Sequence, residues 1–195
     1  MRDQLEKSLS ITRKDIRVYY LKAPNFTYGL LMPVALYLAF SFAGSLNPST
    51  LISGLVSLVI LFGATSIEAV AIVSERTSGT FERLLVAPIT LRWILFGKAL
   101  AGAAFGPLTA VIALVPVLLI SGTTVASPLA ILVAVAVSSF AFASLGILAS
   151  AFAKWIPEAQ MYSNFFRFPM AFLGGAFIPV ASMPPCFKSF RGYYP

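Results

Sequence analysis

Five long apolar segments, separated by short polar ones, make up most of this chain. An α-helix rises about 1.5 Å per residue, so about 20 apolar residues cross the roughly 30 Å hydrocarbon core of a bilayer. Each apolar segment is long enough to cross a membrane as a helix. We therefore predict an all-α, polytopic membrane helix bundle with about five transmembrane helices, in one domain over residues 26–195. The predicted spans are residues 26–43, 51–73, 94–120, 128–152 and 159–180.

Residues 1–25 precede the first apolar segment and are polar and charged. Taken as a helix, they place their apolar residues roughly on one face and their basic residues mostly elsewhere. An amphipathic helix of this kind lies in the membrane interface with its basic side chains toward anionic headgroups. We predict such a helix here, with a solvated, partly disordered tail as the alternative. The apolar set is Leu5, Leu9, Ile16, Tyr19 and Tyr20, and the basic set is Lys7, Arg13, Lys14, Arg17 and Lys22.

The basic residues gather on one side of the predicted membrane. The chain has 14 Lys and Arg and a formal net charge of +7. If five spans alternate in direction, all of the basic residues except Lys188 and Arg191 share a side with the N-terminus. Basic loops mark the cytoplasmic side, so we predict a multi-pass protein of the cell membrane with a cytoplasmic N-terminus. This explains the positive charge without nucleic acid, for which the chain has no basic face with stacking aromatics.

The composition excludes several kinds of chemistry. Only 11% of the residues are charged, against about 25% in soluble domains. The chain has no histidine, which excludes histidine metal sites and Ser-His-Asp triads. The pair Gly97-Lys98 does not complete a phosphate-binding loop, because Arg92 and Ala99 stand where glycine and a hydroxyl residue are needed. We therefore predict no enzyme activity, cofactor or metal site in this chain.

Two ionisable residues, Glu68 and Arg167, lie inside apolar segments. A carboxylate at membrane depth is a candidate for function. Glu68 has either a role inside the bundle or in a dimer interior, or a position from which it reaches the nearby interface. For Arg167 the favoured interpretation is snorkelling to the cytoplasmic headgroups, and the alternative is a pair with Glu68.

The most informative polar segment is residues 75–88, which we expect to form a loop between the second and third spans. Ser78, Gly79 or Thr80 can cap the start of a helix, and Glu82 then lies in the first turn, where its charge suits the helix dipole. Pro88 ends the helix, because the residue before a proline is disfavoured in the α conformation. We predict a two-turn helix at residues 80–87.

This short helix is amphipathic. Phe81, Leu84 and Leu85 stand at positions i, i+3 and i+4, which places them on one apolar stripe. A short amphipathic helix held away from the membrane on a tight loop is suited to docking. It indicates a partner protein.

The same segment resembles the signature of the ABC-2 type transporter permeases. In that signature an acidic residue is followed by Ser-Gly-Thr, a second acidic residue, Leu and Pro, and a Gly-Lys pair opens the next span. A second segment, residues 165–179, is similar to the fifth span of such permeases and to the turn after it, and its first five residues look most like archaeal members. The residues that match the first signature are Glu75, Ser78, Gly79, Thr80, Glu82, Leu84, Leu85, Pro88, Gly97 and Lys98.

The resemblance implies a subunit of an ABC exporter with six spans, so that this chain is truncated before the sixth. It implies a coupling helix between spans two and three that docks on a separate ATPase subunit, and a unit of two permeases, identical or different, with two ATPases. Phe81, Leu84 and Leu85 are then expected to fill a groove of the ATPase. Ion pairs at the rim of that groove are expected from Glu75, Glu82 and Arg83.

For such an exporter the expected substrate is an amphipathic drug, a lipid or a glycan. The almost uniformly apolar spans fit a lipid-like or amphipathic drug substrate, and they equally fit helices that face lipid. Two other functions stay open. A secondary transporter or channel needs ionisable groups at mid-membrane on several spans, and only Glu68 and Arg167 are candidates. A membrane assembly subunit without transport activity is the second alternative.

Overall fold

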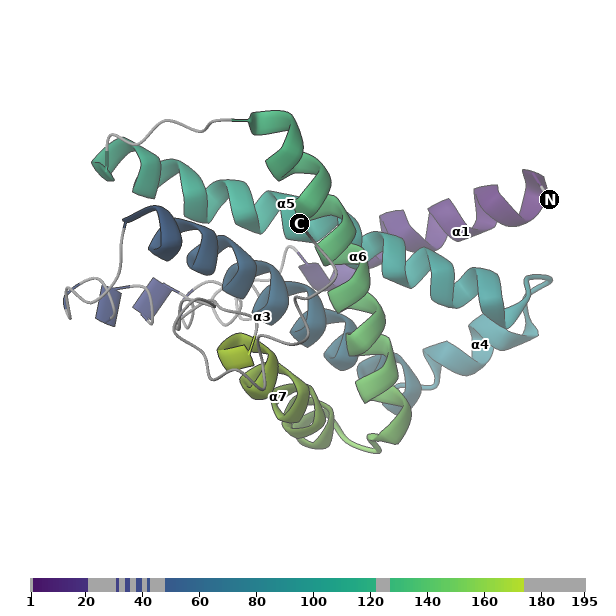
Figure 1. Cartoon of the computed structure of the whole chain (residues 1–195). Helices are drawn as coiled ribbons and strands as arrows, with labels where there is room; N and C mark the ends of the chain where they lie inside the picture. Colours follow the sequence, from purple (N-terminus) through teal and green to yellow (C-terminus); the bar gives the residue numbers. More distant parts are fainter. Residues whose placement is uncertain are drawn as a thin grey trace, which may run out of the picture.

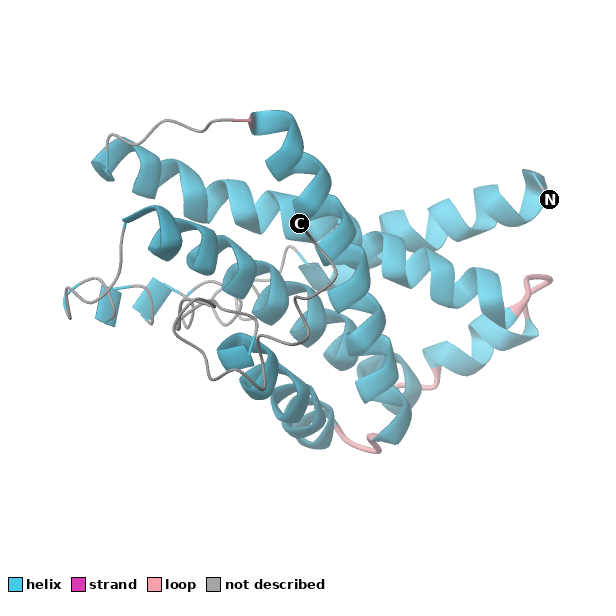
Figure 2. Cartoon of the chain, in the orientation of Figure 1, coloured by secondary structure: helices cyan, strands magenta, loops and turns pink. Residues whose placement is uncertain are grey.

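The computed structural model describes residues 2–20, 48–121 and 127–173, together with a few positions between residues 31 and 42. In these parts of the chain all regular structure is helical, which confirms the predicted all-helical bundle (Figures 1 and 2). The elements are α1 (Arg2–Asp15), the π-helix η1 (Ile16–Tyr20), α3 (Pro48–Thr77), α4 (Thr80–Val86), α5 (Leu91–Ser121), α6 (Pro128–Phe152) and α7 (Ile156–Leu173).

Three helices of the described chain are long and apolar enough to cross a membrane. They include the segments Ile52–Thr77, Leu91–Val115 and Pro128–Phe152, which overlap the second, third and fourth predicted spans. Most of the first predicted span, residues 26–43, lies outside the described residues. The fifth, residues 159–180, begins in α7 and continues past the last described residue of that helix.

Helix α3 is the centre of the bundle. It packs against α5, α6 and α7, and α5 packs against α6 (Figure 1). Of the apolar window in α3, 89% is buried, whereas the corresponding figure for α6 is 22%. Helix α6 therefore turns most of its apolar side chains outward, as a helix in contact with lipid or with another subunit does.

Small residues allow α3, α5 and α6 to approach closely. A Cβ atom on Gly102 of α5 would lie 2.5 Å from Cβ of Ala143 in α6. A Cβ atom on Gly146 of α6 would lie 2.5 Å from the carbonyl oxygen of Thr65 in α3. Helices in membranes gain stability from such close packing, which larger side chains would prevent.

Helices α1 and α4 lie at one end of the bundle, which we call the α4 end. Helix α1 packs beside the first turns of α5, and α4 connects the last turn of α3 to the start of α5 (Figure 1). The last turn of α6 reaches the same end, because Arg76 Nη1 donates a hydrogen bond to the carbonyl oxygen of Ala153 (3.1 Å).

Candidate functional site

Helix α4 follows α3 after a sharp turn of only two residues, Ser78 and Gly79. Gly79 is its N-cap and has φ 71° and ψ 3°, in the left-handed region that favours glycine. The N-cap makes no side-chain hydrogen bond. The sequence analysis gave Ser78, Gly79 and Thr80 as candidate N-caps, and the structure places Gly79 there. Ser78 and Thr80 have another role. Their hydroxyls donate to the carbonyl oxygen of Glu75 (3.2 and 3.1 Å), so they complete the end of α3.

Pro88 limits α4 to seven residues. Ala87, the residue before this proline, is extended, with φ −66° and ψ 151°, as expected from the clash that a proline ring imposes on its predecessor. The backbone N–H of Ala87 still donates to the carbonyl oxygen of Leu84 (3.3 Å). The helix therefore ends within the predicted range of residues 80–87.

The side chains of α4 are presented outward, since none of its residues is buried. Glu82 and Arg83 are exposed, and Phe81 and Leu84 are half-buried. Leu85 is 49% exposed. Sequence reasoning missed Val86, which is 87% exposed; it lies outside the i, i+3, i+4 stripe, so the periodicity gave no signal for it.

At the end of α3 that leads into α4, four charged side chains from α1, α3 and α5 form a buried cluster, which we call the ion-pair cluster. Lys98 Nζ of α5 lies 2.9 Å from Asp15 Oδ2 of α1 and 2.7 Å from Glu75 Oε2 of α3. Lys14 Nζ of α1 lies 3.0 Å from Asp15 Oδ1 and also pairs with Glu75. Each carboxylate therefore meets two ammonium groups, and each ammonium group meets two carboxylates.

Three members of the ion-pair cluster, Asp15, Glu75 and Lys98, are fully buried, and Lys14 is partly exposed. Burial of charges is costly unless they are paired, and here they neutralise one another within the chain. Burial lowers the pKa of Lys14, but the carboxylates of Glu75 and Asp15 outweigh this effect and raise it above its ordinary value. The cluster therefore holds α1, α3 and α5 together close to the turn that leads into α4.

The cluster changes the roles expected for two residues. Glu75 does not lie on the exposed surface of α4, because its carboxylate is engaged with Lys98 and Lys14. Lys14 had been placed among the side chains that face lipid headgroups, but it pairs with carboxylates of the protein. Asp15 carried no signal in the sequence, since nothing in its neighbourhood distinguishes it from a solvated residue.

Helix α1 docks on α5 through a polar face. A Cβ atom on Gly97 would lie 2.7 Å from the carbonyl oxygen of Ser8, so glycine permits the approach. Thr12 Oγ1 donates to the carbonyl oxygen of Gly97 (2.8 Å). The pair Gly97-Lys98, which does not complete a phosphate-binding loop, thus forms the contact of α5 with α1. Gly97 allows the close approach, and Lys98 pairs with Asp15 of α1.

Two apolar side chains of α1 are exposed beside the face that docks on α5. Leu5 is 39% and Leu9 55% exposed, while Ser8 and Ile11 are buried against the bundle. The N-terminal part of α1 also touches the loop after α4, because Lys7 Nζ donates to the carbonyl oxygen of Pro88 (3.3 Å). Helix α1 therefore contacts both α5 and the loop after α4, and it carries two exposed leucines.

The two ionisable residues predicted within the membrane are both buried but do not meet. Glu68 lies against α5 and α6, where Cβ atoms on Gly102 and Gly146 would come within 3.2 and 3.1 Å of it. Arg167 is 1% exposed, so its side chain does not snorkel. Its Nη1 donates to Asn164 Oδ1 (3.0 Å), and its guanidinium lies 5.4 Å above the centre of the Phe62 ring. The favoured interpretation of Arg167 was therefore wrong, because α3 covers the guanidinium.

A family model described as "ABC-2 type transporter" matches residues 9–194. The chain therefore belongs to the ABC-2 type transporter family, and it is a membrane protein, in agreement with its apolar helices. Among curated proteins it is similar to Nodulation protein J of Sinorhizobium fredii, with 35% identity over 117 residues, which cover 60% of this chain and 44% of that protein. The match thus spans less than half the length of this relative. No solved structure matches the chain.

Proposed function

We infer that this chain is the transmembrane permease subunit of an ATP-driven ABC transporter, and that α4 couples it to a separate ATPase subunit. The observation that carries this proposal is a seven-residue helix without a buried residue, joined by a two-residue turn to the last turn of α3, where Glu75 enters the ion-pair cluster. Membership of the ABC-2 type transporter family supports it, since this family supplies the non-enzymatic transmembrane component of such transporters.

The groups that α4 presents suit a protein partner. Leu85 and Val86 supply exposed apolar area, with Phe81 and Leu84 half-buried beside them. We assign the ion pairs at the rim of the interface to Glu82 and Arg83, which are exposed, and a supporting role to Glu75. Ser78, Gly79, Thr80 and Pro88 set the position of α4 rather than touch the partner.

The contacts of α4 and α3 provide a route by which movement of the ATPase reaches the transmembrane helices. ATP closes the two ATPase subunits and displaces α4 with them. Since only two residues separate α4 from α3, and α3 is bound to α1 and α5 through the ion-pair cluster, these helices move as one body. Helix α3 is also the helix on which α7 packs, so the displacement reaches the centre of the bundle.

Two surfaces support the rest of the proposal, namely contact with a second permease copy or lipid and the orientation in the cell membrane. Along α7, four large apolar residues spaced at i, i+4, i+7 and i+11 are 44–72% exposed, and this stripe suits a second permease copy or lipid. At the α4 end, the basic residues of α1, α4 and the first turn of α5 favour a cytoplasmic location in the cell membrane. The stripe on α7 consists of Met161, Phe165, Phe168 and Phe172.

Co-purification in detergent with the ATPase encoded beside this chain tests the proposal. We expect the wild-type chain to retain the ATPase and the double variant Leu85→Asp, Val86→Asp to lose it, because two charges then replace the exposed apolar contact. Trp155→Asp is the matched control, since Trp155 is an exposed apolar residue in the loop between α6 and α7. Equal retention of the ATPase by all three proteins contradicts the proposal.

We further propose that the transporter moves an amphipathic substrate out of the cell. This is supported by the apolar composition of the spans and by the family. ATP-dependent efflux from proteoliposomes that contain both subunits, absent without ATP, is the expected result. Transport that follows an ion gradient and ignores ATP would identify a secondary transporter instead.

A further inference from the structure

Arg167 is a buried cation whose hydrogen bonds are mostly unused. It has the largest of the fully buried side chains in the described chain. Only Nη1 has a hydrogen-bond partner, Asn164, whereas Nε and Nη2 have none. The ring of Phe62 interacts favourably with the guanidinium, but it accepts no hydrogen bond in the guanidinium plane. A buried cation in this state is costly, and within the predicted fifth span it is a candidate for function.

Polar side chains adjoin Arg167 along the face of α7 that meets α3. Gln160, Ser163, Asn164 and Arg167 stand at i, i+3, i+4 and i+7, which places them on one helical face. Gln160 Nε2 donates to Ser66 Oγ of α3 (3.4 Å). Ser163 Oγ is buried without a hydrogen-bond partner. The unused groups of this face are therefore donors, two guanidinium nitrogens with three N–H groups between them and a hydroxyl, and a carboxylate or phosphate is the acceptor that they suit.

The described residues supply no counter-ion to Arg167. Of its seven Asp and Glu residues, none forms an ion pair with Arg167 in the part of the chain that the structure describes. Glu68 is turned toward α5 and α6, on the other side of α3. The sequence segments 21–47 and 174–195 contain no Asp or Glu. A second copy of the described residues would bring the same carboxylates, already buried or at the α4 end, so the described residues leave the counter-ion position of Arg167 open to a ligand.

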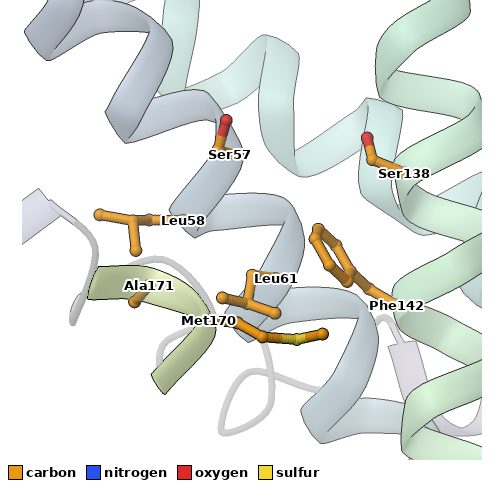
Figure 3. A pocket seen from close by; sticks show the side chains of 7 residues that line it. All are labelled: Ser57, Leu58, Leu61, Ser138, Phe142, Met170 and Ala171. Atoms are coloured by element: carbon orange, nitrogen blue, oxygen red, sulfur yellow. The ribbon is translucent and has the colours of Figure 1, made fainter. Parts of the chain in front are cut away.

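An apolar pocket lies next to this face. It has a volume of about 180 Å³ and is lined by side chains of α3, α6 and α7 (Figure 3). Ala171, in its wall, is one helical turn from Arg167, and Phe62 packs in one cluster with Ala171 and two leucines of the pocket. Figure 3 shows Phe142 and Met170 reaching toward Leu61 from two sides. The pocket lining is Ser57, Leu58, Leu61, Ser138, Phe142, Met170 and Ala171.

We propose that Arg167 and Ser163 bind the acidic group of an anionic amphiphile, a carboxylate, phosphate or sulfate on an apolar body, and that the pocket takes part of this body. The inference deepens the proposed transport function and rests on it for its physiological meaning. It names the charge and shape of the substrate class, which the apolar spans alone do not.

The test is the binding of decyl phosphate to the purified chain in a neutral maltoside detergent. Binding is measured from the rise in unfolding temperature as the concentration of the probe increases. Decanol and decyltrimethylammonium are the neutral and cationic counterparts. We expect decyl phosphate to bind the wild-type chain at least tenfold more tightly than either. Arg167→Gln should lose this preference, and Lys154→Gln, which removes an exposed lysine from the loop between α6 and α7, should keep it. Equal affinity of the three probes, or unchanged affinity in Arg167→Gln, overturns the proposal.

A second variant supplies a counter-ion within the protein and guards against misfolding of Arg167→Gln. Asn164 already accepts a hydrogen bond from Arg167, so Asn164→Asp places a carboxylate beside the guanidinium. We expect this variant to unfold at a higher temperature than the wild type without ligand and to lose at least tenfold in affinity for decyl phosphate. Retention of wild-type affinity in a folded Asn164→Asp variant also overturns the proposal.

Two further comparisons complete the test. One distinguishes a lipid headgroup from a separate amphiphile as the source of the anion, and the other keeps the anion-binding proposal distinct from the proposed coupling at α4. In nanodiscs of phosphatidylcholine, competition of added phosphatidylglycerol with decyl phosphate identifies a lipid headgroup as the ligand, and lack of competition identifies a separate amphiphile. The measurements use the permease without the ATPase. Failure of anion binding therefore leaves the coupling result at α4 intact, and failure of ATPase retention leaves the binding result intact.

Discussion

The ion-pair cluster and Arg167 are two buried charged regions of the same bundle that are satisfied in opposite ways. In the cluster, two ammonium groups and two carboxylates from α1, α3 and α5 neutralise one another. At Arg167, one amide oxygen and one aromatic ring face a guanidinium that keeps two nitrogens unbonded. The comparison teaches that burial of charge alone does not identify a function: balanced opposite charges hold helices together, whereas a buried cation without an opposite charge leaves room for the ligand that we propose.

The largest effect is expected from removing a cation of the cluster. Lys98→Met leaves Asp15 and Glu75 buried with only the partly exposed Lys14 as a partner. Breaking a buried ion pair in this way costs about 3–5 kcal/mol. Thermal unfolding in detergent measures the loss, with Arg92→Met at an exposed position of α5 as the control. A Lys98→Met variant as stable as this control would show that the cluster does not hold the helices together.

The corresponding change at Arg167 should have the opposite sign. Arg167→Met removes a cation without a counter-ion and replaces it by an apolar side chain of comparable length. Replacement of buried charged groups by packed apolar ones is often neutral or stabilising, by about 1–4 kcal/mol. The same unfolding experiment measures it. A loss of stability as large as that of Lys98→Met would remove the distinction between the two regions.

A third prediction concerns how α1 reaches the cluster. Gly97→Val inserts a side chain where the backbone and side chain of Ser8 lie within 2.8 Å of the new Cβ. Overpacking of this kind costs about 1–3 kcal/mol, and it moves Asp15 away from Lys98. We expect Gly97→Val to lower the unfolding temperature less than Lys98→Met and to increase proteolysis of α1. Little further loss in the double variant would show that both act through the docking of α1.

Sequence patterns located the helices well because each depends on neighbours along the chain. The apolar segments and the end of α4 before Pro88 follow from hydropathy and from local sterics. The pairing of Asp15 with Lys98 joins residues 83 positions apart, and no local pattern encodes it. The burial of Arg167 likewise depends on Phe62 of α3. Snorkelling was the expected behaviour because a lone arginine in a span usually finds the interface, and only the packing of α3 on α7 excludes it.

The smallest expected effect is a dependence of stability on alkaline pH. The pKa of Lys14 is raised above its ordinary value of 10.5 because Glu75 and Asp15 outweigh the effect of burial. The pKa of Tyr19 is also raised, first by burial and then by the charge of Glu75. A group with a raised pKa stabilises the fold fully below its ordinary pKa, and this contribution is lost as the pH rises through the pKa of the folded state.

We therefore expect stability to be insensitive to these two groups near neutral pH and to decrease above pH 10.0 through Tyr19 and above pH 10.5 through Lys14 as well. The decrease should be small, because Lys14 is partly exposed and solvent screens its pairs. Unfolding temperatures from pH 8 to pH 11, compared between the wild type and Lys14→Met, test this expectation. The wild type should decline more steeply than the variant, and parallel curves would place the alkaline sensitivity elsewhere. Since Lys98 keeps its two carboxylates in the Lys14→Met variant, this experiment also shows how much the exposed half of the cluster adds to the buried half.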